Sequence, residues 1–174
     1  MWITKELGKN FFDVNEETAL MSPFKELIES VGKRRASNIM WSIYLVYHPD
    51  SIYYLKYGED EVARQKAVNK EFNNRESVVN FGEYKNIITA FDELIPPSIK
   101  SLAKWETELK SFDRYTDGLT FESNFKQKIE ALKEKPNVWK MFMEAKKEYE
   151  SDSREASANR GNYQGSFLEK GMLN

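Results

Sequence analysis

The sequence predicts an all-α fold, in which a helical bundle-like domain of five to seven helices carries an extended N-terminal arm and a C-terminal tail. Apolar residues recur every three or four positions, most clearly in residues 82–95 and 98–112, which is the spacing of one helix face. Proline and glycine separate these stretches. Charged residues make up 31% of the chain and fill the positions between. We expect the arm at residues 1–21, the domain at 22–150 and the tail at 151–174.

The arm has anchor aromatics but no lasting period. Trp2, Phe11 and Phe12 stand among scattered charges, so we expect an extended segment whose aromatic side chains bind a partner chain. The alternative is a segment that lies over its own domain.

The first helix is expected to begin at Ser22, an N-cap residue followed by proline at the first helical position. Its apolar stripe continues to Val31, and Gly32 interrupts it. The basic residues 33–37 that follow resemble a phosphorylation or phosphate-contact site, with a solvated turn as the alternative.

Residues 39–47 are the most apolar window of the chain. They are too few to span a bilayer, which takes about 20 residues. Because the window is apolar on every side, we expect a central core helix with neighbours all round. Pro49 ends it by forcing His48 out of helical geometry. A buried strand is the alternative.

The next segments are more polar. Residues 52–57 are aromatic. Residues 61–73 are expected to form a charged helix that is largely exposed or meets a polar partner, and its weak face is formed by Val62, Lys66, Asn69 and Phe72. A clear amphipathic helix follows over residues 82–95, and Pro96 and Pro97 end it.

The second half reads as bundle helices. The repeat in residues 98–112 suits a packed helix, and residues 116–118 read as a turn. We expect a further helix that carries Phe121, Phe125, Ile129 and Leu132 and is broken at Pro136. A last helix is carried by Val138, Phe142, Ala145 and Tyr149, with Trp139 and Met143 beside its stripe.

The tail changes in character. Residues 151–165 are polar and predict a flexible tether. Four apolar residues beyond the tether predict a docking segment that buries against another subunit: Phe167, Leu168, Met172 and Leu173. A frayed terminus is the alternative.

Several function classes are disfavoured by composition. The chain has no cysteine and a net charge of −2, so disulfides, thiolate catalysis and a broad basic surface for nucleic acid or membrane are not expected. The first residues lack a signal-peptide layout, so we expect a soluble protein made in the cytoplasm. His48 is the sole histidine and is expected to be capping or buried. We expect no catalytic, cofactor or metal site, and no enzyme.

Two short patterns resemble a metal loop and a nucleic-acid-binding surface. Residues 113–118 match part of a calcium loop but lack its third-position carboxylate and its closing glutamate, so an inter-helix turn is the better interpretation. Lysines between Trp139 and Tyr149 alternate with glutamates, which is the pattern of a solvated helix face, so we do not expect nucleic-acid binding.

One family resemblance remains. Residues 41–51, an aromatic helix that ends in a Pro-Asp-Ser turn, together with residues 166–171, resemble small virion proteins of tailed bacteriophages, with those of crAss-like phages nearest. The resemblance implies a non-enzymatic structural or assembly protein of the virion, in contact with other virion subunits in a symmetric oligomeric assembly, and it supplies no catalytic residues. The alternative is a helical regulatory or adaptor protein that binds a host protein or nucleic acid.

Overall fold

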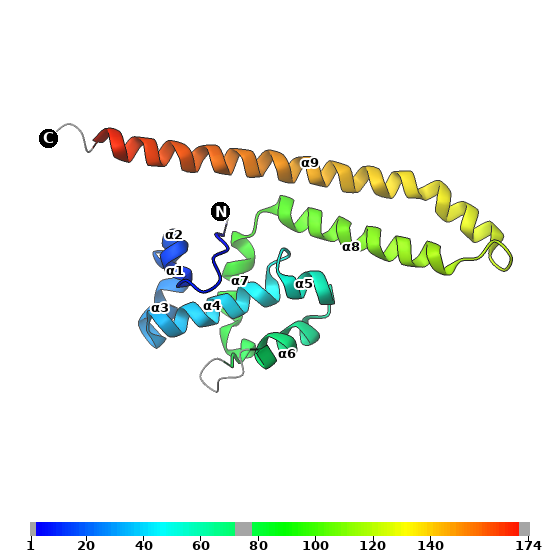
Figure 1. Cartoon of the computed structure of the whole chain (residues 1–174). Coiled ribbons are helices and arrows are strands. Elements are labelled where there is room, and N and C mark those ends of the chain that lie inside the picture. Colours follow the sequence, from blue (N-terminus) through cyan, green and yellow to red (C-terminus); the bar gives the residue numbers. More distant parts are fainter. Residues whose placement is uncertain (1–2, 72–77, 171–174) are drawn as a thin grey trace. The chain divides into compact units, whose positions relative to one another are not determined.

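The computed structural model describes residues 3–71 and 78–170, although nothing is said of the side chains of residues 157 and 159–170 (Figure 1). The described residues are helical and contain no β-strand, so the all-α prediction is confirmed. The chain divides into two compact units, Met1–Pro96 and Pro97–Asn174. In chain order the helices are α1 (Phe11–Val14), α2 (Glu16–Ala19), α3 (Phe24–Val31), α4 (Lys33–Tyr47), α5 (Ile52–Tyr57), α6 (Glu61–Glu71), the 3-10 helix η1 (Phe81–Tyr84), α7 (Lys85–Leu94), α8 (Pro97–Gly118) and α9 (Phe125–Lys170).

Helix α4 is the centre of the first unit. Every residue from Ile39 to Val46 is buried, and α1, α3, α5, α6 and α7 all pack on this helix. The prediction of a core helix at residues 39–47 is therefore confirmed. It ends as expected, because His48 adopts an extended backbone before Pro49 and its N–H donates to the Tyr44 carbonyl over 2.9 Å. Ser51 then caps α5, accepting from Tyr54 N–H over 3.0 Å.

The N-terminal segment differs from the expected extended arm. It contains the short helices α1 and α2, and Asn10 caps α1 by accepting from Phe12 N–H over 3.0 Å. Asn15 ties the first residues down, because its side chain accepts from Thr4 N–H over 2.7 Å. The segment is thus part of the first unit, held by polar bonds that an apolar pattern does not reveal.

Helix α6 packs through a different face from the one predicted. Val62 is 59% exposed, whereas Arg64 and Val68 are buried. The Arg64 guanidinium lies over the Tyr54 ring, 4.5 Å from its centroid, and donates to the Gly58 carbonyl. A long cationic side chain can bury its aliphatic stem, so Arg64 can occupy the inner face of α6 although Val62 is the more apolar residue.

The second unit is an antiparallel hairpin of α8 and α9 (Figure 1). Lys128 joins the two ends of the loop by donating to the carbonyls of Thr116 and Leu119, over 2.6 and 2.8 Å. Further along, Lys135 Nζ and Asp113 Oδ1 form an ion pair at 2.9 Å.

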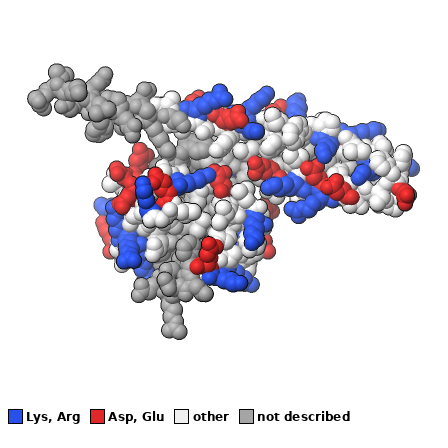
Figure 2. Space-filling model, viewed as in Figure 1, with Lys and Arg blue, Asp and Glu red and all other residues white. Residues whose placement is uncertain are grey.

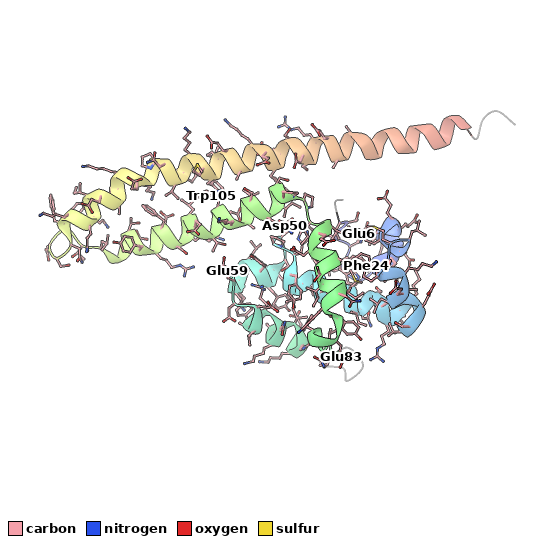
Figure 3. The ribbon with its side chains drawn as sticks, turned by 180° about the vertical axis from the view of Figure 1, so that it is seen from behind. Glu6, Phe24, Asp50, Glu59, Glu83 and Trp105 are labelled. Atoms are coloured by element: carbon pink, nitrogen blue, oxygen red, sulfur yellow. The ribbon has the colours of Figure 1, made fainter. Side chains whose placement is uncertain are left out.

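The apolar seam of the hairpin has the predicted spacing. Half-buried residues recur on α8 at Leu102, Trp105, Leu109 and Phe112, and on α9 at Val138, Phe142 and Tyr149 with Ala145 buried among them. Trp105, labelled in Figure 3, lies midway along α8. Steps of three and four on both partners are the pattern of two helices packed along their length.

Two boundary predictions for this unit are wrong. Pro136 lies inside α9 and does not end it, and residues 151–165, expected to be a flexible tether, continue the same helix. Extending an existing helix does not require a new nucleus, so residues on both sides of Pro136 can share one helix although the proline itself lacks one hydrogen bond. The predicted divisions after residues 21 and 150 also differ from the observed division at Pro96 and Pro97.

Candidate functional site

His48, the sole histidine, is a structural residue in the first unit. Its side chain is 1% exposed, its ring stacks on Tyr44 at 4.7 Å, and the Phe91 ring lies edge-on at 6.3 Å. The Asp50 N–H donates to Nδ1 over 3.2 Å. Burial lowers the pKa of His48 to about 4, so the ring is neutral at pH 7. The prediction of a buried, capping histidine is confirmed, and no substrate can reach this ring.

The tyrosines beside it are also unsuited to proton transfer at neutral pH. Burial, together with a 2.8 Å hydrogen bond to Glu61, raises the pKa of Tyr47 to about 12. Burial and the nearby Asp50 carboxylate raise the pKa of Tyr44 further. Both phenols therefore stay protonated: Tyr47 makes hydrogen bonds with Glu61 and Gln65, and Tyr44 packs its ring among Trp41, His48 and Phe91.

The basic segment at residues 33–37 is neither an accessible phosphorylation site nor a solvated loop. It forms the start of helix α4, and Ser37 is 3% exposed. The Ser37 hydroxyl accepts from Phe11 N–H over 2.8 Å, so it is occupied by the N-terminal segment. Lys33 lies one turn before Ser37 on the same face of α4. Lys33 is exposed and pairs with Asp13 of α1 at 2.5 Å, whereas Ser37 is buried beneath the N-terminal segment.

The incomplete calcium pattern also resolves into helix. Residues 113–118 are the last residues of α8, and the loop between the hairpin helices comes after them. Asp113 pairs with Lys135, whose pKa its carboxylate raises. Within residues 3–71 and 78–170 no group of three or more histidine or carboxylate side chains is placed to hold a metal ion.

One small pocket is present in the first unit. Its volume is about 200 Å³, and it lies between α4 and the segment around η1. The lining residues are Arg35, Asn38, Ile39, Val78, Val79, Asn80, Glu83 and Tyr84. The lining offers one cation and one carboxylate, without the adjacent nucleophile and base that covalent catalysis requires.

The predicted partner-binding aromatics of the N-terminus belong to the core. Phe11 and Phe12 are 0% and 1% exposed, and Phe11 packs edge-on against Trp41 at 5.0 Å. This corrects the expectation that they bind a partner, because α1 turns both rings inward. Trp2 lies outside the described residues.

The predicted docking segment at the C-terminus stays a prediction. Phe167 and Leu168 lie within α9, in the part of it whose side chains are not described. Met172 and Leu173 lie outside the described residues.

The strongest surface feature is a second apolar row on α9, which we call the outer stripe. Its six members follow one another in alternating steps of four and three: Phe125, Ile129, Leu132, Pro136, Trp139 and Met143. Phe125, Leu132 and Trp139 are 60%, 43% and 50% exposed. In the face shown by Figure 2, uncharged side chains gather over the end of the hairpin where α9 follows α8.

The sequence does not reveal the outer stripe when the helix is taken to end at Pro136. Phe125, Ile129 and Leu132 then belong to one predicted helix, and Trp139 and Met143 lie beside the stripe of the next. Read as one helix, the row keeps its register through the proline. The unbroken alternation of four and three was the available signal.

No helix in the described parts of the chain is both long enough and apolar enough to cross a membrane. Comparisons with protein-family models, curated proteins and solved structures found no match for this chain.

Proposed function

We propose that this chain is a non-enzymatic assembly protein that acts through protein–protein contacts. The observation that carries the proposal is the outer stripe of α9, with three large apolar side chains at least 43% exposed. Within the described residues of the second unit, α8 covers one face of α9 and no third element is present to cover the other. Contiguous apolar rows left in water typically mark a binding surface.

The setting that we propose is the virion of a tailed bacteriophage, as a head, neck or tail component or a packaged protein. Its support is the resemblance at residues 41–51 and 166–171. Other virion subunits would then be the partners, in a symmetric assembly in which many copies share one contact. In this setting a weak contact suffices, because neighbouring subunits raise the effective concentration.

The second candidate is a helical regulatory or adaptor protein that binds a host protein or nucleic acid. The observation that favours it is a row of exposed lysines beside the outer stripe, because such charges attract acidic molecules generally: Lys126, Lys133, Lys140 and Lys147.

The two candidates are separated by analysing purified particles. A gel with mass spectrometry should find the chain at a stoichiometric copy number, and its absence from particles would favour the adaptor.

The outer stripe itself is tested in the same particles. Trp139→Glu should reduce incorporation at least tenfold while leaving the melting temperature nearly unchanged, because the side chain is half exposed. Tyr115→Glu is the matched control, since Tyr115 is 55% exposed on α8 and lies off the stripe. Normal incorporation of the Trp139 variant would remove the stripe from the proposal.

A further inference from the structure

We propose that the outer stripe binds an acidic amphipathic helix of another protein, in a coiled-coil contact along residues 125–147 of α9. This inference rests on the proposed function in protein–protein contact and adds the chemistry of the partner. Three observations carry it: the width of the stripe, the charge along its open border, and the poor fit of a second copy.

The stripe is narrow. At about 100° per residue, its six members lie within about 80° of the helix circumference. A strict row with alternating steps of four and three is the seam of a coiled coil, whereas a helix lying on a membrane presents a broader apolar face. The side chains are also large enough to act as knobs between the residues of a facing helix. A helix is therefore the shape that the stripe accommodates.

One border of the stripe is uniformly basic. Four lysines, which we call the lysine column, follow it at intervals of seven residues: Lys126, Lys133, Lys140 and Lys147. All four are exposed. Among the described residues, Lys140 has only a weak pairing with Glu144 at 3.9 Å, and the other three form no ion pair. Positions that flank a coiled-coil seam select partners by charge, so this border selects glutamate or aspartate.

The other border is already in use. Lys128 bonds to the loop carbonyls and Lys135 to Asp113, and Phe142 and Tyr149 belong to the seam with α8. A helix that binds the outer stripe would therefore lie next to the lysine column, whose ammonium groups form no strong ion pair among the described residues. At about 100° per residue, Glu130 and Glu144 lie one turn from Lys126 and Lys140, each farther round the helix from the stripe than its lysine, and Glu134 lies farther still. The positions that flank the stripe directly on this side are therefore the four lysines.

A second copy of this chain fits the stripe poorly. In an antiparallel pair of α9 helices the two lysine columns would face each other, and like charges at flanking positions disfavour the pairing. Placing α9 against α8 of another copy does not help, because α8 has one apolar row and that row faces its own α9. A helix of a different protein can place apolar side chains on the outer stripe and carboxylates beside the lysine column.

The test uses the full chain and two synthetic helical peptides. Both carry leucine at the seam positions, and they differ in having glutamate or lysine at the flanking positions. We expect the glutamate peptide to bind at least tenfold more tightly than the lysine peptide, as measured by fluorescence anisotropy at low salt, with the preference shrinking as salt rises.

Variants assign the preference to the stripe and the column. Lys133→Glu combined with Lys140→Glu should reverse the preference, and Leu132→Ala combined with Trp139→Ala should weaken binding of both peptides. The matched control, Lys104→Glu with Lys110→Glu, changes net charge equally on exposed positions of α8 and should leave the preference intact. Circular dichroism of each variant establishes that the helices are kept.

Other outcomes overturn the inference. Equal binding of the two peptides, or reversal by the α8 control, removes the role of the lysine column. A dimer in sedimentation that Trp139→Ala abolishes would make a second copy the occupant. Tighter binding to vesicles of phosphatidylglycerol or to a DNA duplex would make the column a site for those polyanions. If the glutamate peptide is preferred but purified particles lack the chain, only the virion setting is refuted. If particles contain the chain but neither peptide is preferred, only the acidic helix is refuted.

Discussion

At the scale of single residues, the chemistry of this chain is directed inward. His48, Tyr44 and Ser51 are buried, and each has a backbone or ring partner in the first unit. Ser51 Oγ donates to the Leu45 carbonyl over 2.7 Å while it caps α5, so one side chain joins the end of α4 to the start of the next helix. The groups that would otherwise be candidates for catalysis stabilise the fold.

This burial predicts a pH dependence of stability. The pKa of His48 is about 4 in the folded chain against 6.5 for the unfolded chain, so protonation favours unfolding. The stabilising effect is complete above pH 6.5 and is lost as the pH falls toward 4. We expect the free energy of unfolding to fall by roughly 2 to 3 kcal/mol from this group between pH 7.5 and 4.5. Urea titrations at both pH values measure it.

The control for this prediction is His48→Asn, whose amide does not titrate. Carboxylates lower stability in acid in both proteins, so the difference between their pH slopes isolates the histidine. Identical slopes would contradict the prediction and would mean that the ring is hydrated in solution.

At the scale of elements, α9 is unusual in its length and in its proline. Its 46 residues are about 69 Å long, against about 33 Å for the 22 residues of α8, at 1.5 Å per residue. The second half of α9 therefore extends beyond its partner (Figure 1). Pro136 lacks the N–H that would bond the Leu132 carbonyl, and the ribbon of α9 bends in its yellow stretch in Figure 1.

Pro136→Ala should therefore stabilise the hairpin. The change restores one helical hydrogen bond and removes a ring that clashes with the preceding turn, which together are worth up to about 3 kcal/mol in a helix interior. We expect a higher midpoint of unfolding and greater ellipticity at 222 nm.

Asn137→Ala is the neighbouring control, where only helix propensity changes, by a few tenths of a kcal/mol. A lower midpoint for Pro136→Ala would show that the bend is needed for packing against α8.

At the scale of the whole molecule, the two units differ in how their contacts are made. The first brings distant segments together: Phe11 contacts Trp41, Tyr44 contacts Phe91, and the Trp41 indole donates to the Lys9 carbonyl over 2.8 Å. The second is one hairpin, whose contacts lie between two adjacent helices. Cores that join distant segments unfold cooperatively, whereas a two-helix hairpin has little to oppose local opening.

This predicts that residues 1–96 fold without the rest. The fragment should give a sharp thermal transition within a few degrees of the main transition of the full chain, because Phe11, Trp41, Tyr44 and Phe91 pack on one another within it. The hairpin should contribute a broader transition at lower temperature. Circular dichroism of fragment and full chain measures both. An unfolded fragment would show that the first unit depends on residues 97–174.

The sequence by itself determined the elements of this protein and the positions of several ends. Apolar residues at three-four spacing specify α7 and α8, a window that is apolar on every side specifies the buried part of α4, and Pro49 and Pro96 end helices. Spacing and proline can do this because they act on the local backbone. The absence of cysteine excludes disulfides and thiolate catalysis, and a single histidine cannot form a cluster of histidine ligands.

Only the tertiary structure decided which apolar residues are covered. Phe11 and Trp139 look alike in the sequence as aromatics beside charged residues, yet one is 0% and the other 50% exposed. Phe11 meets Trp41, thirty positions along the chain, while α8 reaches only one of the two apolar rows on α9. Whether an apolar residue is buried depends on which distant segments of the chain pack against it, and a local sequence pattern does not contain that information.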